Sequence, residues 1–274
     1  VFASTVLLVS IAPAQTTDDY AAVRARLRAD QTGGDRLDAN DPVLAAKVSA
    51  LNNSAQTHWN NLNKASARTL LWSDLTISPT KSDTITPVFE RLKTLAAAFA
   101  TPGAALKGNP ALRDDIVSGL EWLNRNHYSL GRSYYDNWFP WHLAVPLNLV
   151  DIFACLHDGL DAQTRIRLYA AYASAVDFYQ ASAGPTYANT GANRVWRSRI
   201  DVGLGAALES APRLASGRDK LSVVLPYVTI GDGFYADGSF IQHNTHSYTG
   251  GYGLYLISEL SAVLEAIAAT PWAV

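Results

Sequence analysis

The sequence has very little cysteine and little charge. Cys155 is the one cysteine among 274 residues, which excludes a disulfide within the chain and a metal site built from several cysteines. Its place in the apolar run 150–156 predicts a small side chain in the core. Charged residues make up 17% of the chain, against roughly a quarter in an average soluble domain. The net charge of −2 provides no basic field, so we expect neither nucleic acid nor a membrane as a partner.

Apolar and aromatic residues, in contrast, are abundant. The chain is 48% hydrophobic and contains 7 Trp, 13 Tyr and 8 Phe, enough for one large core in a single domain. Aromatic side chains also suit sugar binding, because the apolar faces of pyranose rings stack on flat side chains. Composition alone leaves open how many of these rings pack in the core and how many face a ligand.

The first residues have the pattern of an export signal. An apolar stretch over residues 1–11 is followed by Ala12-Pro13-Ala14, as in the apolar region and cleavage site of a secretory signal peptide. The stretch is too short to span a bilayer. We therefore expect residues 1–14 to be the remnant of a signal peptide, residues 15–274 to form the folded domain, and the protein to be secreted. A buried N-terminal strand or helix is the alternative.

Helical signals dominate the rest of the chain. Apolar residues spaced three and four apart predict helices over residues 18–30, 86–100, 162–179, 192–208 and 253–268. Asp41-Pro42 and Asn109-Pro110 each combine a capping side chain with a proline at the first helical position, which predicts two more helix starts. A helix over 138–156 must kink or restart at Pro140 and Pro146. The best strand candidate is the run 221–230, so the expected fold is mainly α-helical, with antiparallel helix pairs in a bundle, a solenoid or a ring.

Three segments mix aromatic, amide and glycine residues where a plain core helix would have leucines. They are residues 134–141, 187–194 and 232–253. Polar and aromatic loops on a rigid helical frame are where functional sites usually lie. We therefore place the candidate site in these segments.

The same segments resemble the signature stretches of polysaccharide lyase family 8, which includes hyaluronate, chondroitin AC and xanthan lyases. That family shows Asn-Trp-Trp, Thr-Gly-Ala-Asn, Asp-Gly-Ser-Phe-x-Gln-His and Tyr-Thr-Gly-x-Tyr-Gly. The matching stretches here are Asn137-Trp138-Phe139, Thr190-Gly191-Ala192-Asn193, Asp237-Gly238-Ser239-Phe240-Ile241-Gln242-His243 and Tyr248-Thr249-Gly250-Gly251-Tyr252-Gly253. Their order and spacing agree as well, and four linked motifs are far more specific than any one of them.

The resemblance implies a mainly all-α fold. Members of the family have an incomplete (α/α) toroid of helical hairpins, followed by antiparallel β-sandwich domains. They are far longer than 274 residues, so residues 15–274 would be the toroid catalytic domain, truncated at its C-terminus, with the sandwich domains absent. We expect a monomer that acts on an acidic polysaccharide without a cofactor or metal.

The resemblance also implies a carbon–oxygen lyase that works by β-elimination. This reaction removes the proton on C5 of a uronate and expels the oxygen on C4, so the neighbouring carboxylate must be neutralised first. By resemblance, Asn193 neutralises that carboxylate by hydrogen bonding. His243 and Tyr252 share the transfer of protons, and the sequence does not decide which of the two is the base.

The first motif is expected to hold the sugar chain. By resemblance, Trp138 and Phe139 take the place of paired tryptophans that stack on sugars, although Phe139 lacks the indole N–H. Asn137 would bind sugar hydroxyls or the carboxylate. Tyr187, six residues before Asn193, extends this aromatic patch.

Polar substrate contacts are expected from the second and third motifs. Arg194 and Arg197 share a helix face at a spacing of three residues and can meet the carboxylates of the polymer. The alternative is a solvated face or an ion pair with Asp201. Gln242, directly before His243, is also assigned to substrate binding.

Two other functions compete with the lyase. A glycoside hydrolase on a similar toroid needs two carboxylates across the scissile bond, and Asp136, Asp232 or Asp237 can supply one. Asp232 and Asp237, flanked by glycines, more simply set turns. A non-catalytic carbohydrate-binding fragment is the second competitor, because the family places a catalytic Arg and a supporting Glu beyond residue 274. A zinc site at His243 and His246 lacks a third ligand.

The substrate stays open among several uronate polymers. Family members that cleave glycosaminoglycans usually have a Trp-Glu-Ile-Gly pattern, where this chain has Trp141-His142-Leu143-Ala144. Xanthan-cleaving members lack that Glu and share a pattern that resembles Asn193-Arg194-Val195-Trp196. Hyaluronan, chondroitin, xanthan and alginate therefore all remain candidates.

Overall fold

The computed structural model describes residues 16–38, 40–182 and 186–274, with backbone alone for residues 186 and 187. The predicted signal remnant, residues 1–14, lies outside this part. The α-helices are α1 (Thr17–Thr32), α2 (Pro42–Asn60), α3 (Thr86–Ala100), α4 (Pro110–Asn126), α5 (Val145–Leu156), α6 (Ala162–Ala181), α7 (Gly191–Ala207), α8 (Ala211–Leu221) and α9 (Leu254–Ile267). Short 3-10 turns are η1 (Gly34–Arg36), η2 (Ser82–Ile85), η4 (His157–Gly159) and η5 (Thr186–Asn189), and π-helical turns are η3 (Pro140–Ala144) and η6 (Thr249–Gly253).

The helices begin where capping residues predict. The side chain of Asp41 accepts hydrogen bonds from the backbone N–H groups of Val43 and Leu44 at the start of α2. Asn109 caps α4 in the same way, and Pro42 and Pro110 take early positions where no N–H is needed. These local signals are why the predicted helix starts are confirmed.

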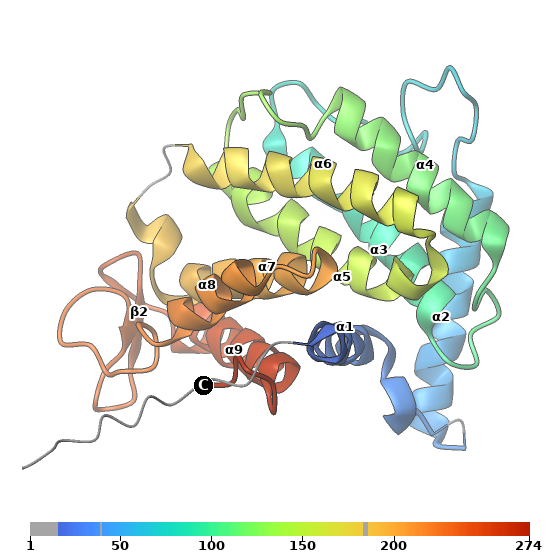
Figure 1. Ribbon diagram of the computed structural model, residues 1–274. Helices are drawn as coiled ribbons and strands as arrows, with labels where there is room; N and C mark the ends of the chain where they lie inside the picture. The colour runs from blue at the N-terminus through green and yellow to red at the C-terminus, as the bar shows by residue number, and fades with distance from the viewer. Residues whose placement is uncertain (1–15, 39, 183–185) are drawn as a thin grey trace, which may run out of the picture.

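The helices form two curved layers (Figure 1). Helices α3, α5, α7 and α9 contact one another in chain order, and α1 packs against all four. On the other side, α2 and α4 contact α3, and α6 and α8 contact α7. This arrangement of paired helices is an incomplete α/α toroid, which confirms the fold that the family resemblance implied.

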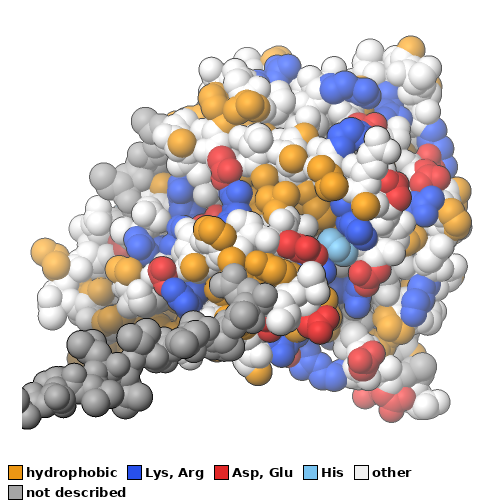
Figure 2. Space-filling model, viewed as in Figure 1, with side chains coloured by type: hydrophobic (Ala, Val, Ile, Leu, Met, Phe, Trp, Pro, Cys, Tyr) orange, Lys and Arg blue, Asp and Glu red, His pale blue; other side chains and the backbone are white. Residues whose placement is uncertain are grey.

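Most of the aromatic side chains pack in or against the hydrophobic core. Five tryptophans are buried: Trp72, Trp122, Trp141, Trp196 and Trp272. Tyr128, fully buried, stacks on Trp141 with 6.1 Å between ring centroids and donates its hydroxyl to the Trp141 carbonyl at 2.7 Å. Cys155 is 3% exposed and is a small core side chain, as predicted. On the surface shown in Figure 2, acidic and basic side chains are interspersed.

The strand predicted over 221–230 is wrong. This run begins with the last residue of α8 and continues as turns and bends, and Val223 and Ile230 are 57% and 86% exposed. The sheet lies instead in the third motif, where β1 (Gly233–Phe234), β2 (Phe240–Gln242) and β3 (His246–Ser247) pair antiparallel in that order. Short strands of two or three residues leave no alternating pattern that sequence reading could detect.

Pro140 and Pro146 are accommodated by a wide turn that runs directly into α5. The chain is helical from Trp138 onward, and the π-helical η3 follows directly. The N–H of Val145 bonds to the carbonyl of Pro140, five residues earlier. Such π turns occur often at functional sites. In the described part of the chain, no helix has both the length and the apolar character to cross a membrane.

Candidate active site

Asp232 joins the second motif to the third. Its Oδ2 accepts hydrogen bonds from Thr190 Oγ1 at 2.6 Å and from Gln242 Nε2 at 2.8 Å. Its Oδ1 accepts the backbone N–H of Asn244 at 2.6 Å. The expected turn role is therefore wrong for Asp232, which cross-links segments distant in sequence. Asp237 does set a local turn, because its carboxylate accepts from Ser239 N and Oγ.

Gln242 supports the first turn of α7. It is fully buried, and its Oε1 accepts the backbone N–H of Ala192 at 3.1 Å. Gly191 lies directly against it, since a Cβ at this position would be 2.3 Å from Gln242 Oε1. Both polar ends of the Gln242 amide are thus engaged by Ala192 and Asp232. The observed role of Gln242 is to hold the motifs together, whereas the sequence predicted a contact with substrate.

These bonds bring Asn193 and His243 into one neighbourhood, because the residues preceding them, Ala192 and Gln242, are hydrogen-bonded to each other. Asn193 is the third residue of α7 and is 1% exposed. The N-terminus of a helix carries a partial positive charge from its unpaired N–H groups. A carboxylate that reaches Asn193 would therefore meet an amide at a favourable helix end.

The rings of His243 and Tyr252 are in edge-to-face contact. Their ring centroids lie 5.1 Å apart at an interplanar angle of 85°. Tyr248 packs against the same pair, 5.1 Å from Tyr252 and 6.3 Å from His243. Tyr252 lies within the π-helical turn η6. The imidazole and the phenol predicted to move protons are therefore neighbours.

The backbone at His243 is strained. His243 and the following Asn244 have φ values of 57° and 64°, in the left-handed region that costs a non-glycine residue roughly 1–2 kcal/mol. The sheet and the bond from Asn244 N to Asp232 hold this conformation. Strain of this kind concentrates at functional sites, where the surrounding structure fixes it.

A band of aromatic rings joins the first motif to Tyr252. Trp138 contacts Phe139 at 5.9 Å, Phe139 contacts Trp196 at 5.6 Å, and Trp196 contacts Tyr252 at 5.9 Å between centroids. Tyr255 borders Trp196 at 6.1 Å. Trp196 and Tyr255 were not assigned to the site from the sequence. The spacing of Trp196, three residues after Asn193 on a helix, is the signal that identifies it.

Asp136 and Asn137, directly before Trp138, fix the backbone there through side-chain hydrogen bonds. The carboxylate of Asp136 accepts hydrogen bonds from Ser82 N at 3.0 Å and Ser82 Oγ at 3.1 Å. These bonds hold the pKa of Asp136 below its ordinary value. The side-chain oxygen of Asn137 accepts the N–H of Phe139 at 2.9 Å. Asn137 is exposed beside Trp138, in a position compatible with its predicted sugar contact.

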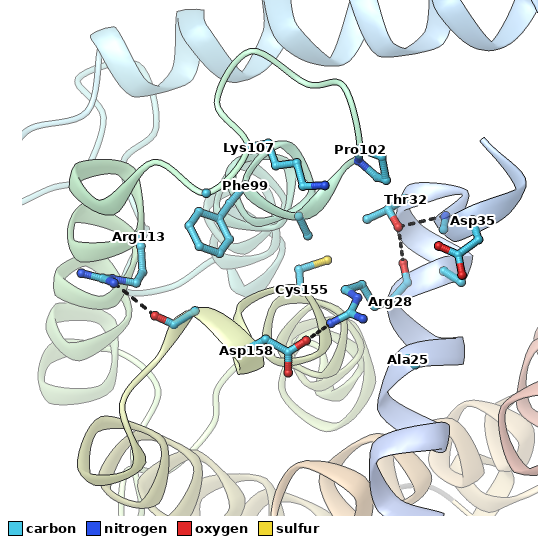
Figure 3. A pocket seen from close by; sticks show the side chains of 15 residues that line it. Ala25, Arg28, Thr32, Asp35, Phe99, Pro102, Lys107, Arg113, Cys155 and Asp158 are labelled. Carbon is cyan, nitrogen blue, oxygen red and sulfur yellow. Dashed lines mark hydrogen bonds and ion pairs between the residues drawn. The ribbon is translucent and has the colours of Figure 1, made fainter. Parts of the chain in front are cut away.

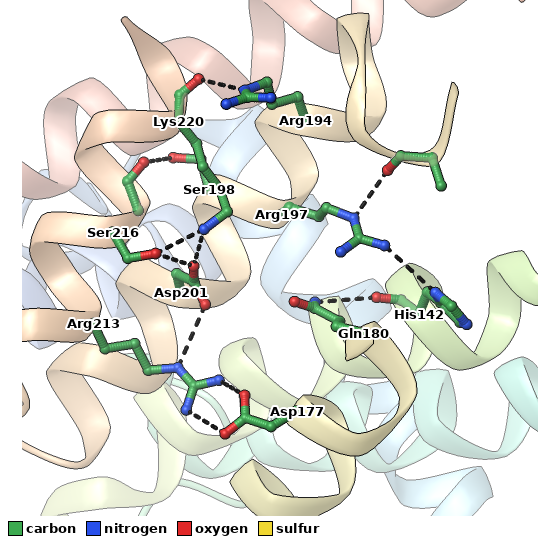
Figure 4. Close-up of polar contacts among 12 residues, drawn as sticks. His142, Asp177, Gln180, Arg194, Arg197, Ser198, Asp201, Arg213, Ser216 and Lys220 are labelled. Atoms are coloured by element: carbon green, nitrogen blue, oxygen red, sulfur yellow. Dashed lines mark hydrogen bonds and ion pairs between the residues drawn. The ribbon is translucent and has the colours of Figure 1, made fainter. Parts of the chain in front are cut away.

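The His142 ring packs against Trp138. It is fully buried, and its ring stands nearly perpendicular to those of Trp138 and Tyr134, at centroid distances of 5.6 and 5.2 Å. Burial, followed by the charge of Arg197, lowers the pKa of His142 to about 4. Arg197 Nη2 is 3.4 Å from its Nδ1 (Figure 4). Ser182 Oγ is 3.3 Å from its Nε2. A guanidinium can only donate hydrogen bonds, so Nδ1 of the neutral His142 ring is the acceptor and its Nε2 has the proton.

Arg194 and Arg197 bond to backbone carbonyls. Arg194 Nε donates to the carbonyl of Lys220 at 3.2 Å, and Arg197 Nε donates to that of Ala188 at 2.9 Å. The alternative pairing with Asp201 is excluded, because Asp201 forms its ion pairs with Arg213 and Lys220 (Figure 4). In the described part of the chain, neither Arg194 nor Arg197 has a carboxylate within ion-pair distance.

Other predicted or possible sites lie elsewhere. The side chain of Tyr187 lies outside the described residues. A cavity of about 690 Å³ is remote from the motifs and is lined by Arg28, Arg113 and Cys155, among others (Figure 3). Its arginines are already engaged, by Asp158 and by the carbonyl of Gly159. Among the described residues, no group of three or more His, Cys, Asp or Glu is arranged to hold a metal ion.

The sequence is similar to several lyases. It is 38% identical over 265 residues to a xanthan lyase from Bacillus sp. strain GL1, covering 95% of this chain and 27% of that protein. It is 32% identical over 259 residues to a hyaluronate lyase from Thermasporomyces composti, covering 94% of this chain and 32% of that protein. The chain therefore spans about a third or less of the length of these relatives.

The fold is similar to solved structures of the same kind. A Paenibacillus xanthan lyase superposes with a TM-score of 0.83 at 37% identity, over 94% of this chain and 24% of that one. A Streptomyces coelicolor chondroitin AC lyase gives a TM-score of 0.83 at 33% identity, over 94% of this chain and 34% of that one. The family model for the N-terminal α-helical domain of polysaccharide lyase family 8 matches residues 28–274. The chain thus belongs to polysaccharide lyase family 8, as its N-terminal helical domain.

Proposed function

We propose that this domain carries the catalytic centre of an enzyme that cleaves a uronate-containing polysaccharide by β-elimination. The observation that supports this most is the linkage of three motifs around one site. Ala192 and Gln242 place Asn193 beside the segment of His243, and His243 faces Tyr252. Trp196 extends the same wall to Phe139. An amide donor, an imidazole and a phenol match the charge stabilisation, the base and the acid that this elimination needs.

Asn193 acts on the carboxylate of the uronate. Its side-chain N–H donates to a carboxylate oxygen, and the N-terminus of α7 adds its partial positive charge. When the C5–H bond breaks, the electron pair moves into the bond between C5 and the carboxyl carbon, which creates a dianionic aci-carboxylate. Because the hydrogen bond strengthens as this charge develops, it stabilises the transition state more than the ground state.

His243 and Tyr252 complete the elimination. One of them accepts the C5 proton, the C4–O bond breaks, and the electron pair forms the C4=C5 double bond. A proton is then delivered to the departing oxygen. Rings whose centroids are 5.1 Å apart can both reach one pyranose, so the phenol can serve as base, as acid or as both, with the imidazole assisting.

The aromatic band and the two arginines bind the polymer. Trp138 and Phe139 offer faces for stacking, and Arg194 and Arg197 offer positive charge for carboxylates. Relatives named as xanthan, hyaluronate and chondroitin AC lyases support an acidic polysaccharide as substrate. Hyaluronan, chondroitin, xanthan and alginate are the candidates. We further propose that the protein is secreted and acts as a monomer.

The hydrolase alternative is disfavoured by the state of the carboxylates. Asp136 is held by Ser82, Asp232 by three donors, and Asp237 by Ser239 in a turn. A general acid needs a carboxyl group that can hold and release a proton at the glycosidic oxygen. Hydrogen bonds from Ser82 and Ser239 hold the pKa values of Asp136 and Asp237 below their ordinary values, which disfavours either group as a general acid.

The product of the reaction tests the proposal. The protein is incubated with each of the four polymers while absorbance in the near ultraviolet and reducing ends are both recorded. A lyase gives a rise in absorbance that matches the new reducing ends, because each cut creates a C4=C5 double bond conjugated with the carboxylate. Reducing ends without absorbance would indicate a hydrolase. Binding of polymer with neither signal would indicate a non-catalytic carbohydrate-binding domain.

A further inference from the structure

Arg199 forms ion pairs with carboxylates from three other helices. It lies in the middle of α7 and is 6% exposed. Its Nη1 donates to Glu259 of α9 at 2.7 Å. Its Nη2 donates to Asp30 of α1 at 2.9 Å and to Asp151 of α5 at 2.8 Å. Lys93 of α3 lies 3.7 Å from the second oxygen of Asp151, so side chains of five helices meet in one cluster.

Stability alone does not account for this Arg199 cluster. Burial by itself would lower the pKa of Arg199, but the three carboxylates, Asp151 first among them, raise it above its ordinary value. Buried ion pairs seldom stabilise a protein more than apolar side chains of the same volume would, because the charges lose their hydration. Their best-attested use is to fix the register between the elements that provide them. The cluster is thus suited to hold α7 at a defined position relative to its neighbours.

The two end nitrogens of the Arg199 guanidinium differ in their acceptors. Nη2 is shared between Asp30 and Asp151, whereas the acceptor of Nη1 is Glu259. Loss of the Asp30 carboxylate therefore leaves Asp151 on the same nitrogen. Loss of the Glu259 carboxylate leaves Nη1 with no carboxylate among the described residues. The link from Arg199 to α9 depends on this one side chain.

The ion pair with Glu259 continues a row of contacts between α7 and α9. Trp196 precedes Arg199 by three residues and so lies on the same side of α7. Its ring contacts Tyr252 at 5.9 Å and Tyr255 at 6.1 Å between centroids. Glu259 follows Tyr255 by four residues, which is the next position along the same side of α9. The row therefore runs from the buried ion pair to the phenol of the proposed site.

Each of the two helices joined by this ion pair positions a proposed catalytic group. Asn193 lies in the first turn of α7. Tyr252 lies in η6, and α9 begins directly after this turn at Leu254. A shift of α9 along or around α7 would change the distance between the amide and the phenol. Misplacement of a reacting group by about 1 Å can cost about 100-fold in rate.

We propose that Arg199 is a positioning residue that holds α9 against α7 through Glu259 and so keeps the Tyr252 phenol at its working distance from the Asn193 amide. The inference rests on the proposed lyase function and adds two residues that lie outside the three motifs. Neither Arg199 nor Glu259 contacts the reacting sugar in this mechanism. Both act through the helices that carry them.

Glu259→Ala tests this role in steady-state kinetics, on whichever polymer gives the most unsaturated product. It should lower kcat roughly 10- to 100-fold, because the phenol is displaced, and leave KM within about twofold. Asp30→Ala is the matched control, since it also removes one carboxylate from Arg199. Helix α1 carries none of the proposed catalytic groups, so this variant should keep kcat within about twofold. Urea unfolding confirms that both variants are folded at the assay temperature.

Two conservative variants complete the series. Glu259→Gln keeps an oxygen that can accept from Arg199 Nη1, and it should retain kcat within about threefold of the wild type. Arg199→Lys keeps the buried positive charge, but one ammonium group cannot span three carboxylates as the guanidinium does. It should lower kcat as Glu259→Ala does, and it provides the test if Glu259→Ala does not fold.

The position of Tyr252 can also be followed without turnover, by fluorine NMR of protein labelled with 3-fluorotyrosine. Tyr252→Phe identifies its resonance among those of the 13 tyrosines. The ring is in edge-to-face contact with His243 and Tyr248, so its chemical shift responds to small movements. The resonance should shift or broaden in Glu259→Ala and stay in place in Asp30→Ala.

The outcomes separate this inference from the proposed function. Equal losses of kcat in Glu259→Ala and Asp30→Ala, or an unmoved Tyr252 resonance in folded Glu259→Ala, would overturn the positioning role. A raised KM with unchanged kcat would also overturn it, because Glu259 would then serve polymer binding. All three leave the lyase function intact if the wild type forms unsaturated product. No unsaturated product from any polymer, with the Tyr252 resonance responding as expected, would refute the lyase function and leave the link between α7 and α9 standing.

Discussion

The ring of His243 stands at 85° to the ring of Tyr252, with 5.1 Å between their centroids. This edge-to-face contact is built from two unusual backbone features, the left-handed conformation of His243 and the π-helical turn that contains Tyr252. Each feature costs free energy locally and is held by contacts from other segments. The arrangement gives an imidazole and a phenol that are close enough to act on one sugar ring.

Tyr252→Phe should reduce kcat by at least about 100-fold, because the proposed mechanism uses the phenol to exchange a proton with C5, with the leaving oxygen or with both. The phenyl ring keeps the contacts with His243 and Trp196, so KM should change little. Tyr248→Phe is the matched control, since Tyr248 packs 5.1 Å from Tyr252 and has no assigned proton transfer. Steady-state kinetics on both variants is the measurement. Comparable losses in the two would assign the effect to packing instead of proton transfer.

Asn193→Ala should reduce kcat by roughly 100- to 1000-fold, the usual effect of removing one donor that stabilises a developing oxyanion. The side chain is 1% exposed at the start of α7, so thermal unfolding must show that the variant is folded. Asn53→Ala on the exposed side of α2 is the control and should behave as wild type. Full turnover by a folded Asn193→Ala variant would remove this residue from the mechanism.

Gly191→Ala should destabilise the domain more than an ordinary glycine replacement in a turn. Gly191 has a φ of 49°, and a Cβ would lie 2.3 Å from Gln242 Oε1. The left-handed conformation costs roughly 1–2 kcal/mol, and displacing the Gln242 amide costs about 1 kcal/mol more through its hydrogen bonds. Gly103→Ala is the control, because its φ is 75° and no atom lies within 4 Å of the added Cβ.

Urea unfolding measures the two glycine variants. We expect Gly103→Ala to lower the free energy of unfolding only by the cost of the left-handed backbone conformation. Gly191→Ala should lower it by at least about 1 kcal/mol more. Gly191→Ala should also lose activity at temperatures where it is still folded, because the hydrogen bond between Ala192 and Gln242 positions Asn193 against the His243 segment. Equal losses of stability in the two variants would mean that the Gln242 side chain moves away from the added Cβ without a cost in free energy.

Much of the fold could be predicted because its signals are local. The caps at Asp41 and Asn109 each determine a helix start within a few residues. Helix α8 was missed, although Pro212 at its first turn is a usable start signal. The site depended on contacts between distant segments. The bonds from Asp232 to Thr190 and Gln242 join residues 42 and 10 positions apart, and no periodicity in the sequence encodes them.

Stability should fall as the solution becomes acidic, and His142 is expected to cause a measurable part of this. Its pKa is about 4 in the folded protein, against roughly 6.5 when unfolded. Between these values the unfolded chain binds a proton that the folded protein does not. The free energy of unfolding therefore rises with pH from 4 to 6.5 and levels off above. This difference between the folded and unfolded pKa of His142 corresponds to a change in the free energy of unfolding of at most about 3 kcal/mol.

The His142→Gln variant isolates this contribution. Glutamine keeps a polar side chain opposite Ser182 and Arg197 but takes up no proton in this range, so its unfolding free energy should vary less between pH 4.5 and pH 7 than that of the wild type. His246→Gln, at an exposed position, should keep the wild-type pH dependence. His157, whose pKa burial and then Arg24 lower to about 4, should account for part of the remaining slope. If His142→Gln keeps the full slope, the buried imidazole is not the group that titrates, and the support of Trp138 by a neutral ring must be abandoned.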